Sequence, residues 1–101
     1  MTQPDDLLAI TSDGSRISAT GEVDAHTAPT LAAAIKRAGT TVSLDLSGIE
    51  FVDSSGLRVL IDEHQRLADA GGALTIVSPS AVVTRLFEIS GVSDYLTIET
   101  N

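Results

Sequence analysis

The sequence contains no cysteine and few basic residues, and both shortages restrict what the protein can be. Without cysteine there is no disulfide bond, thiol nucleophile or thiolate metal site, so packing must hold the fold together. The 14 acidic residues outnumber 6 basic ones, which gives a formal net charge of -8. Nucleic acids and anionic membranes attract proteins through basic side chains, so we expect neither as a partner.

Long apolar runs and export signals are also missing. No segment reaches the ~20 apolar residues that a helix needs to span a bilayer. The N-terminus, MTQPDDLLAI, has no basic region followed by an apolar stretch. We therefore expect a soluble cytoplasmic protein. No linker or internal repeat divides the chain, so the prediction is one domain over residues 7–101, with a frayed N-terminus at residues 1–6.

The hydrophobic periodicity predicts strands that alternate with helices. Asp13-Gly14 is a turn signal between two apolar runs and predicts an antiparallel hairpin. The predicted strands are 7–10, 16–21, 41–46 with a weaker run at 49–52, 73–77 and 95–99. The predicted helices run from Thr27 to Gly39, from Ser54 to Gly71 and from Pro79 to Gly91.

This order of elements predicts the fold class α/β. Right-handed crossovers make the later strands parallel. We expect a mixed, mostly parallel sheet of 4–5 strands with an N-terminal antiparallel hairpin and three or more helices. The apolar side chains expected in the core are Phe51, Leu57, Leu60, Ile61, Leu86 and Phe87. Arg58 and Glu63 are expected on a helix surface that faces solvent or a partner.

The segment FVDSSGL, residues 51–57, joins a predicted strand to a predicted helix. Asp53, Ser54 and Ser55 are favoured helix caps, because a short side-chain oxygen can accept from a free backbone N–H. Capping does not explain Gly56 in the first turn, where glycine costs roughly 1 kcal/mol relative to alanine. Small residues here leave a serine hydroxyl accessible. In α/β sheets this edge carries function, and residues 20–27 belong to the same edge.

An exposed serine also raises the possibility of nucleophilic catalysis. The sequence does not match Gly-x-Ser-x-Gly, and His64 lies about 15 Å along the helix from Ser54. His26, with Asp24 nearby, could approach Ser54, so spacing alone leaves a triad open. A loop or cap role for His26 is the simpler interpretation. No metal-ligand spacing and no phosphate-binding glycine motif is present.

Three long segments resemble one known family. They are ATGEVDAHTAPTL (19–31), LDLSGIEFVDSSGLRVLI (44–61) and AGGALTIVSPSAVVTRLFEISGV (70–92). The chain resembles the bacterial STAS domains that act as anti-sigma factor antagonists, over nearly its whole length. The most specific parts are FVDSSGL after a strand and TGEVD at the expected distance upstream.

The resemblance implies a function and a set of site residues. It implies that Ser54 is phosphorylated by an anti-sigma factor that is also a serine kinase, and that a PP2C-type phosphatase restores the serine. The unphosphorylated form would bind the anti-sigma factor and free the sigma factor. The implied partner-binding residues are Asp24, Thr27, Asp53, Ser55, Gly56 and Arg58. The chain itself would need no cofactor, since ATP and the phosphatase metal would belong to the partners.

One alternative to this interpretation is a STAS module that is not regulated by phosphorylation. Related STAS domains sense small ligands or act as scaffolds without phosphorylation. Many members also continue into a further C-terminal helix, whereas this sequence stops at Asn101. The expected state is a monomer or weak dimer. The sequence does not identify the sigma factor, the anti-sigma factor or the signal.

Overall fold

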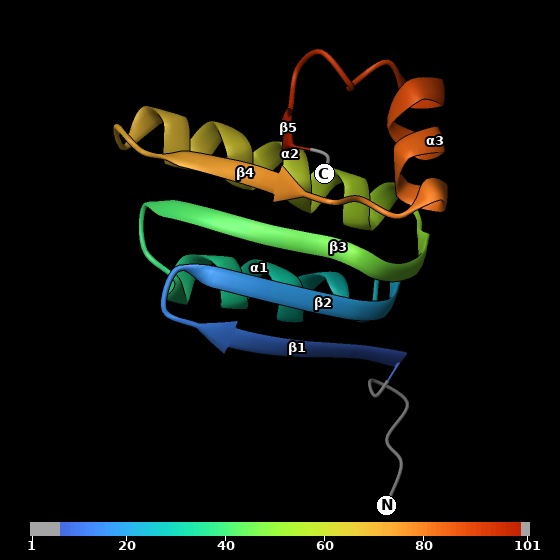
Figure 1. The fold of residues 1–101 in the computed structure, drawn as a ribbon, viewed down its shortest axis with the longest axis horizontal. Helices are drawn as coiled ribbons and strands as arrows, with labels where there is room; N and C mark the ends of the chain where they lie inside the picture. The colour runs from blue at the N-terminus through green and yellow to red at the C-terminus, as the bar shows by residue number, and fades with distance from the viewer. Residues whose placement is uncertain (1–6, 100–101) are drawn as a thin grey trace, which may run out of the picture.

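The computed structural model describes residues 7–99, which form a five-stranded sheet with three helices (Figure 1). The strands are β1 (Leu8–Asp13), β2 (Arg16–Val23), β3 (Thr41–Val52), β4 (Ala73–Val77) and β5 (Thr97–Glu99). The helices are α1 (Ala28–Arg37), α2 (Ser54–Asp69) and α3 (Ala81–Ser90). The expected frayed N-terminus, residues 1–6, lies outside the described residues.

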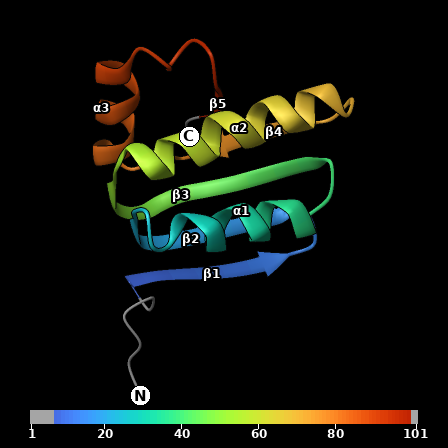
Figure 2. The same ribbon diagram turned by 180° about the vertical axis from the view of Figure 1, so that it is seen from behind.

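The strand order in the sheet is the chain order, β1-β2-β3-β4-β5. β1 pairs antiparallel with β2, and the other neighbours pair parallel, each joined by one helix. The two opposite views show α1 and α2 lying along the same face of the sheet, while α3 stands at one end (Figures 1 and 2). The predicted fold class, a mixed and mostly parallel sheet with an N-terminal hairpin, is confirmed.

Short-range signals set the turns and most of the element ends. The hairpin closes through two residues between Asp13 and Arg16, and Gly14 takes the positive φ of 63° that such a turn requires. α3 begins at Ala81, two residues after the predicted start at Pro79. The hydroxyl of Ser80 accepts from the N–H of Val83 and donates to the carbonyl of Ile49. β5 begins at Thr97, so the predicted strand over 95–99 was too long.

β3 is one continuous strand, and it carries two register shifts against β2. Ser18 pairs with Asp45 but Thr20 pairs with Gly48, and Gly21 pairs with Ile49 but Glu22 pairs with Phe51. At each shift β3 contains one residue more than β2, which is the geometry of a β-bulge. The bulges break the two-residue alternation of side chains after Leu46, so that the buried positions are Val42, Leu44, Leu46, Ile49 and Val52.

The prediction that Phe51 is a core residue was wrong. Its side chain is 46% exposed, while the neighbouring Val52 is buried. Simple alternation from Ile49 would turn residue 51 inward, but the second bulge adds one residue and turns residue 52 inward instead. The C-terminal end of β3 therefore presents the aromatic side chain of Phe51 outward, two residues before Asp53.

α2 is rotated relative to the face that its apolar residues predict. The buried positions are Gly56, Leu60, Glu63 and Leu67. Leu57 and Ile61, both predicted as core, are only half-buried. Leu57 still packs against the edge of the core, whereas Ile61 does not. The prediction for Leu60 is confirmed, as is that for Phe87 of α3, while Leu86 is half-buried. The rotation leaves two apolar side chains near the N-terminus of α2 partly open to solvent.

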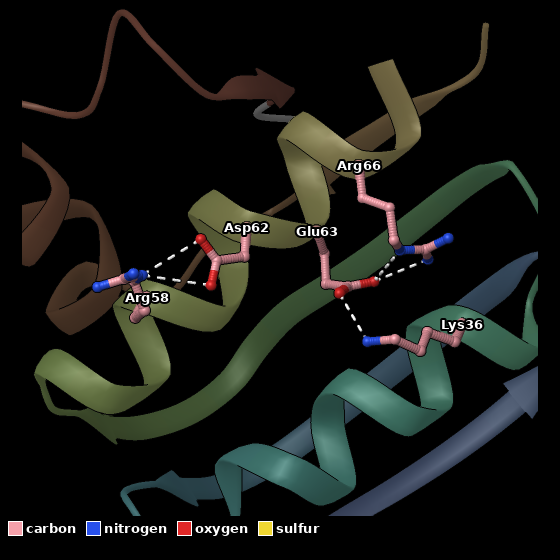
Figure 3. A network of polar contacts seen from close by, with 5 residues as sticks. All are labelled: Lys36, Arg58, Asp62, Glu63 and Arg66. Atoms are coloured by element: carbon pink, nitrogen blue, oxygen red, sulfur yellow. Dashed lines mark hydrogen bonds and ion pairs between the residues drawn. The ribbon is translucent and has the colours of Figure 1, made fainter. Parts of the chain in front are cut away.

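Glu63 is the second clear error of the sequence-based prediction, because it is 4% exposed rather than on the surface. Its carboxylate joins α2 to α1 by accepting from Lys36 Nζ at 2.8 Å and from Arg66 Nη2 at 2.7 Å (Figure 3). Burial alone would raise the pKa of Glu63. The hydrogen bonds from Arg66 and Lys36, and their positive charges, outweigh burial and hold the pKa below its usual 4.5.

We expect Glu63→Gln to lower the free energy of unfolding by about 1–2 kcal/mol at neutral pH, since both cations are partly solvated. A pKa lowered on folding stabilises the protein above the unfolded pKa of 4.5, and this contribution is lost as the pH falls through the folded pKa. Urea unfolding curves of wild type and Glu63→Gln should therefore converge in acid. The matched control is Asp62→Asn in the exposed Arg58 pair, which should change stability little. An equal loss in both variants would contradict the prediction.

Candidate functional site

The two polar loops that the sequence places at one edge of the sheet do meet there. Val23 at the end of β2 pairs with Val52 at the end of β3. The backbone N–H of Asp53 also donates to the carbonyl of Val23 at 3.0 Å. Asp24 and Asp53 therefore follow neighbouring positions on adjacent parallel strands. The prediction that both loops share one edge is confirmed.

The first loop is organised by Asp24. Its Oδ1 accepts from the backbone N–H groups of His26 at 2.9 Å and Thr27 at 3.0 Å. It also lies 3.2 Å from the hydroxyl of Thr27. The hydrogen bond from the Thr27 backbone is the main reason why the pKa of Asp24 lies below its usual value. The carboxylate is thus ionised and locked into the turn that precedes α1.

Thr27 supports this loop from beneath. Its hydroxyl accepts from the N–H of Asp24 at 2.9 Å and lies 3.0 Å from the carbonyl of Glu22. The residue is 1% exposed, so the expectation that its side chain lines the outer surface is not met. It occupies the N-cap position of α1, but its side chain makes no cap hydrogen bond. Its hydroxyl is instead engaged in the hydrogen bonds to Asp24 and Glu22 in the loop.

The second loop begins α2 as the sequence predicts. Asp53 is the N-cap, and its Oδ1 accepts from the N–H groups of Ser55 at 2.8 Å and Gly56 at 3.1 Å. Ser54, the first residue of the helix, is exposed. Within residues 7–99 its hydroxyl makes no hydrogen bond. The cap is therefore complete without Ser54, whose hydroxyl is left facing solvent.

Gly56 has a structural role that the sequence did not reveal. It is buried, and a Cβ built on it would lie 2.7 Å from Val23 Cγ1 and 2.8 Å from Val52 Cγ1. Real Cβ atoms do not approach other carbons so closely. The glycine therefore lets the first turn of α2 sit directly on the ends of β2 and β3. Gly56 sets the height of Ser54 above the sheet, and it does not itself reach the surface.

A shallow hollow of about 480 Å³ lies on the exposed side of α2. It is lined by Ser54, Ser55, Leu57, Arg58 and Ile61. Positions 54, 57, 58 and 61 are one face of a helix. The hollow thus combines hydroxyls with two apolar side chains and one cation. Sequence reasoning assigned both apolar residues to the core, whereas in the structure Leu57 packs against the core and also lines the hollow, and Ile61 belongs to the hollow alone.

Arg58 is held by an exposed ion pair. Its Nε lies 3.2 Å from Oδ1 of Asp62, one helical turn further on (Figure 3). Because both side chains are largely exposed, at 76% and 59%, the pair is weak and the arginine can exchange partners. Arg58 is therefore a cation available to an anionic group near Ser54.

The geometry gives no support to a catalytic triad. Asp24 uses Oδ1 for backbone and hydroxyl groups, and within residues 7–99 no hydrogen bond joins the His26 ring to Asp24 or Ser54. In the same range no cluster of three or more His, Asp or Glu residues could hold a metal ion. None of the described helices is long and apolar enough to cross a membrane.

Comparison with known proteins gives one consistent result. The STAS domain family matches residues 9–101. A relative from Listeria monocytogenes, named anti-sigma-B factor antagonist, is 33% identical over 92 residues, covering 87% of this chain and 81% of the relative. A Bacillus subtilis relative of the same name is 28% identical over 86 residues, covering 82% and 79%. The solved structure of the antagonist SpoIIAA in its unphosphorylated form is similar with a TM-score of 0.70 and 22% identity, covering 90% and 86%.

Proposed function

This chain belongs to the STAS domain family of bacterial anti-sigma factor antagonists, and we propose from that premise that a phosphate on Ser54 switches its partner binding off. Proteins of this family regulate by binding other proteins and are not enzymes. In the proposed cycle the unphosphorylated chain binds an anti-sigma factor that is also a serine kinase. The anti-sigma factor then releases its sigma factor.

The surface around Ser54 supports binding to another protein. It offers the apolar side chains Leu57 and Ile61 beside the serine hydroxyls, with Arg58 at the rim. Phe51, 46% exposed, precedes the same junction. Apolar groups ringed by polar ones are typical of a protein-binding patch. In this proposal Asp24, Ser55 and Arg58 contact the partner, while Thr27 and Gly56 shape the surface from beneath.

One observation carries the switch: the Ser54 hydroxyl is exposed at a helix N-terminus whose cap is already filled by Asp53. A kinase can reach that hydroxyl without unfolding the helix. The phosphate adds roughly -1.5 to -2 charges beside Asp53, where the helix dipole tolerates negative charge. A helix that stays folded then presents a bulky anion to a partner shaped for a hydroxyl. SpoIIAA, one of the structural neighbours, has also been solved in a phosphorylated form.

The cofactors of this cycle belong to the partners in our proposal. The kinase supplies ATP, and a PP2C-type phosphatase uses its own metal ion to remove the phosphate. The chain itself carries no cofactor and works in the cytoplasm as a monomer or weak dimer. The net charge of -8 is consistent with a partner that presents a basic surface.

Incubation with the cognate anti-sigma kinase and ATP, followed by intact-mass and fragment mass spectrometry, tests the proposal. We expect one added phosphate, located on Ser54. Ser54→Ala should accept none, whereas Ser55→Ala should still be modified, because Ser55 is half-buried beside the capping carboxylate.

Two results would count against the proposal. The first is an active kinase that leaves the wild type unmodified, which would favour a STAS module that senses ligands without phosphorylation. The second is a phosphate that remains in Ser54→Ala and disappears in Ser55→Ala. That result would identify Ser55, and not Ser54, as the phosphorylated residue.

A further inference from the structure

The outer edge of β1 is not paired within residues 7–99. β1 is the first strand in the sheet and pairs only with β2, in an uninterrupted register from Leu8↔Gly21 to Asp13↔Arg16. Such an edge presents free backbone N–H and C=O groups. Proteins usually protect an edge with proline, lysine or a bulge, and β1, with the sequence LAITSD, has none of these. The opposite edge, β5, is only three residues long.

A groove runs along this edge between β1 and α1. Figure 2 shows α1 lying along the sheet beside β1. The groove has a volume of about 410 Å³, and its apolar part is formed by Ile10, Pro29, Ala33 and Ala34. Arg37 and Ser12 line it too, and they also line a second hollow of about 210 Å³ beside Gly14. The groove thus has an apolar part and, toward the hairpin, one cation.

Arg37 is available to a ligand. Lys36, Arg58 and Arg66 are engaged in ion pairs, whereas within residues 7–99 Arg37 makes none. Asp13, the only acidic residue of β1, cannot neutralise the groove. Side chains alternate along a strand, and Leu8 is buried under the helices, so residue 13 points to the opposite face.

We propose that β1 and α1 together bind an extended peptide segment of a partner protein, which adds to β1 as a sixth strand. Antiparallel addition is favoured because its hydrogen bonds are slightly more stable per residue. The segment would carry apolar residues at alternate positions, to fill the groove over Ala33 and Ala34. An acidic residue near its N-terminal end would meet Arg37. This mode of recognition combines backbone pairing with a few side-chain pockets.

A peptide fits this edge better than a second copy of the chain. Two copies paired through β1 would keep Asp13 on the face away from the groove, so neither copy could offer β1 carboxylates to Arg37. Each copy also brings a net charge of -8, which opposes association. The site lies on β1 and α1, apart from the hollow beside Ser54, so the proposal does not depend on the phosphorylation switch.

A short synthetic peptide tests the proposal on the full chain. The probe is acetyl-Glu-Thr-Val-Thr-Val-Thr-amide, and the control has Gln in place of Glu. Titration into isotope-labelled protein, followed by NMR of the backbone amides, should shift signals along β1 and the facing side of α1. Hydrogen exchange should slow at alternate β1 amides, and the control peptide should bind more weakly.

Two arginine variants check the chemistry of the groove. Arg37→Gln should weaken binding of the glutamate peptide about fivefold, as expected for one partly exposed charge pair. Arg16→Gln is the matched control, because Arg16 is also exposed but lies opposite Asp13 in the β1–β2 register, on the face away from the groove. It should bind as wild type does. Thermal melts of both variants establish that they remain folded.

Three positive results would overturn the proposal. They are equal weakening in both arginine variants, shifts that concentrate on α2 rather than β1, and concentration-dependent pairing through β1 without peptide. The last result would identify the edge as a self-association surface. An unchanged spectrum at saturating peptide would also contradict it.

Discussion

Ser54→Asp is expected to weaken binding to the anti-sigma factor by at least about 30-fold, which corresponds to ~2 kcal/mol. The reason is local. The substitution places a charge in the hollow formed with Leu57 and Ile61, which in the proposed complex the partner covers. An unpaired charge buried in an interface costs several kcal/mol. Calorimetric titration or surface plasmon resonance with the purified partner measures the loss.

The same variant should keep its fold. The N-terminus of α2 favours a negative charge, and the hydrogen bonds from Ser55 and Gly56 to Asp53 do not involve the Ser54 side chain. We expect a circular dichroism spectrum like that of the wild type and a melting temperature within a few degrees. Ser47→Asp is the matched control, because Ser47 is exposed and follows core residue Leu46 on the other face of β3. It should bind normally. A collapsed Ser54→Asp fold would refute the local explanation.

Gly56→Ala is the second large effect, and it acts on stability. The new Cβ would lie within 3 Å of methyl groups on both Val23 and Val52. Alanine favours a helix by roughly 1 kcal/mol over glycine, but overpacking a core costs typically 1–3 kcal/mol. Because valine side chains on two strands cannot both move aside freely, we expect a net loss of about 1–2 kcal/mol. Denaturant unfolding measures it.

Two further variants separate packing from helix propensity. Ser55→Ala also introduces alanine into the first turn of α2, but it adds no Cβ, so it should be neutral or slightly stabilising. Val52→Ala removes one of the clashing methyl groups, so it should cost less in the Gly56→Ala background than in the wild type. If Gly56→Ala were as stable as the wild type, the tight packing of α2 on β2 and β3 would be disproved.

A large part of the fold could be predicted because its signals are local. Residues that are close neighbours in the sequence determine the Asp13-Gly14 turn, the Asp53 cap and the helix end at Gly91. The parallel pairing follows from the alternation of strands and helices. The same logic correctly placed the loops at residues 20–27 and 51–56 on one edge, because parallel strands end on the same side.

The errors share a different origin. Phe51 is exposed because β3 bulges against β2. A bulge depends on how two strands pair, so the sequence of one strand does not predict it. Glu63 is buried because Lys36, 27 residues earlier, and Arg66 both reach its carboxylate. Leu57 and Ile61 are partly exposed because Gly56 and Leu60 occupy the buried face of α2 and so set the rotation of the helix on the sheet.

The sequence by itself determined the order of strands and helices and the Asp53 cap, and it singled out Ser54 through its resemblance to the STAS family. Periodicity and capping are short-range properties of neighbouring residues, so they can be read along the chain. Only the tertiary structure decided which side chains surround that serine. Which face of α2 meets the sheet depends on packing between distant residues, above all the contact of Gly56 with Val23 and Val52.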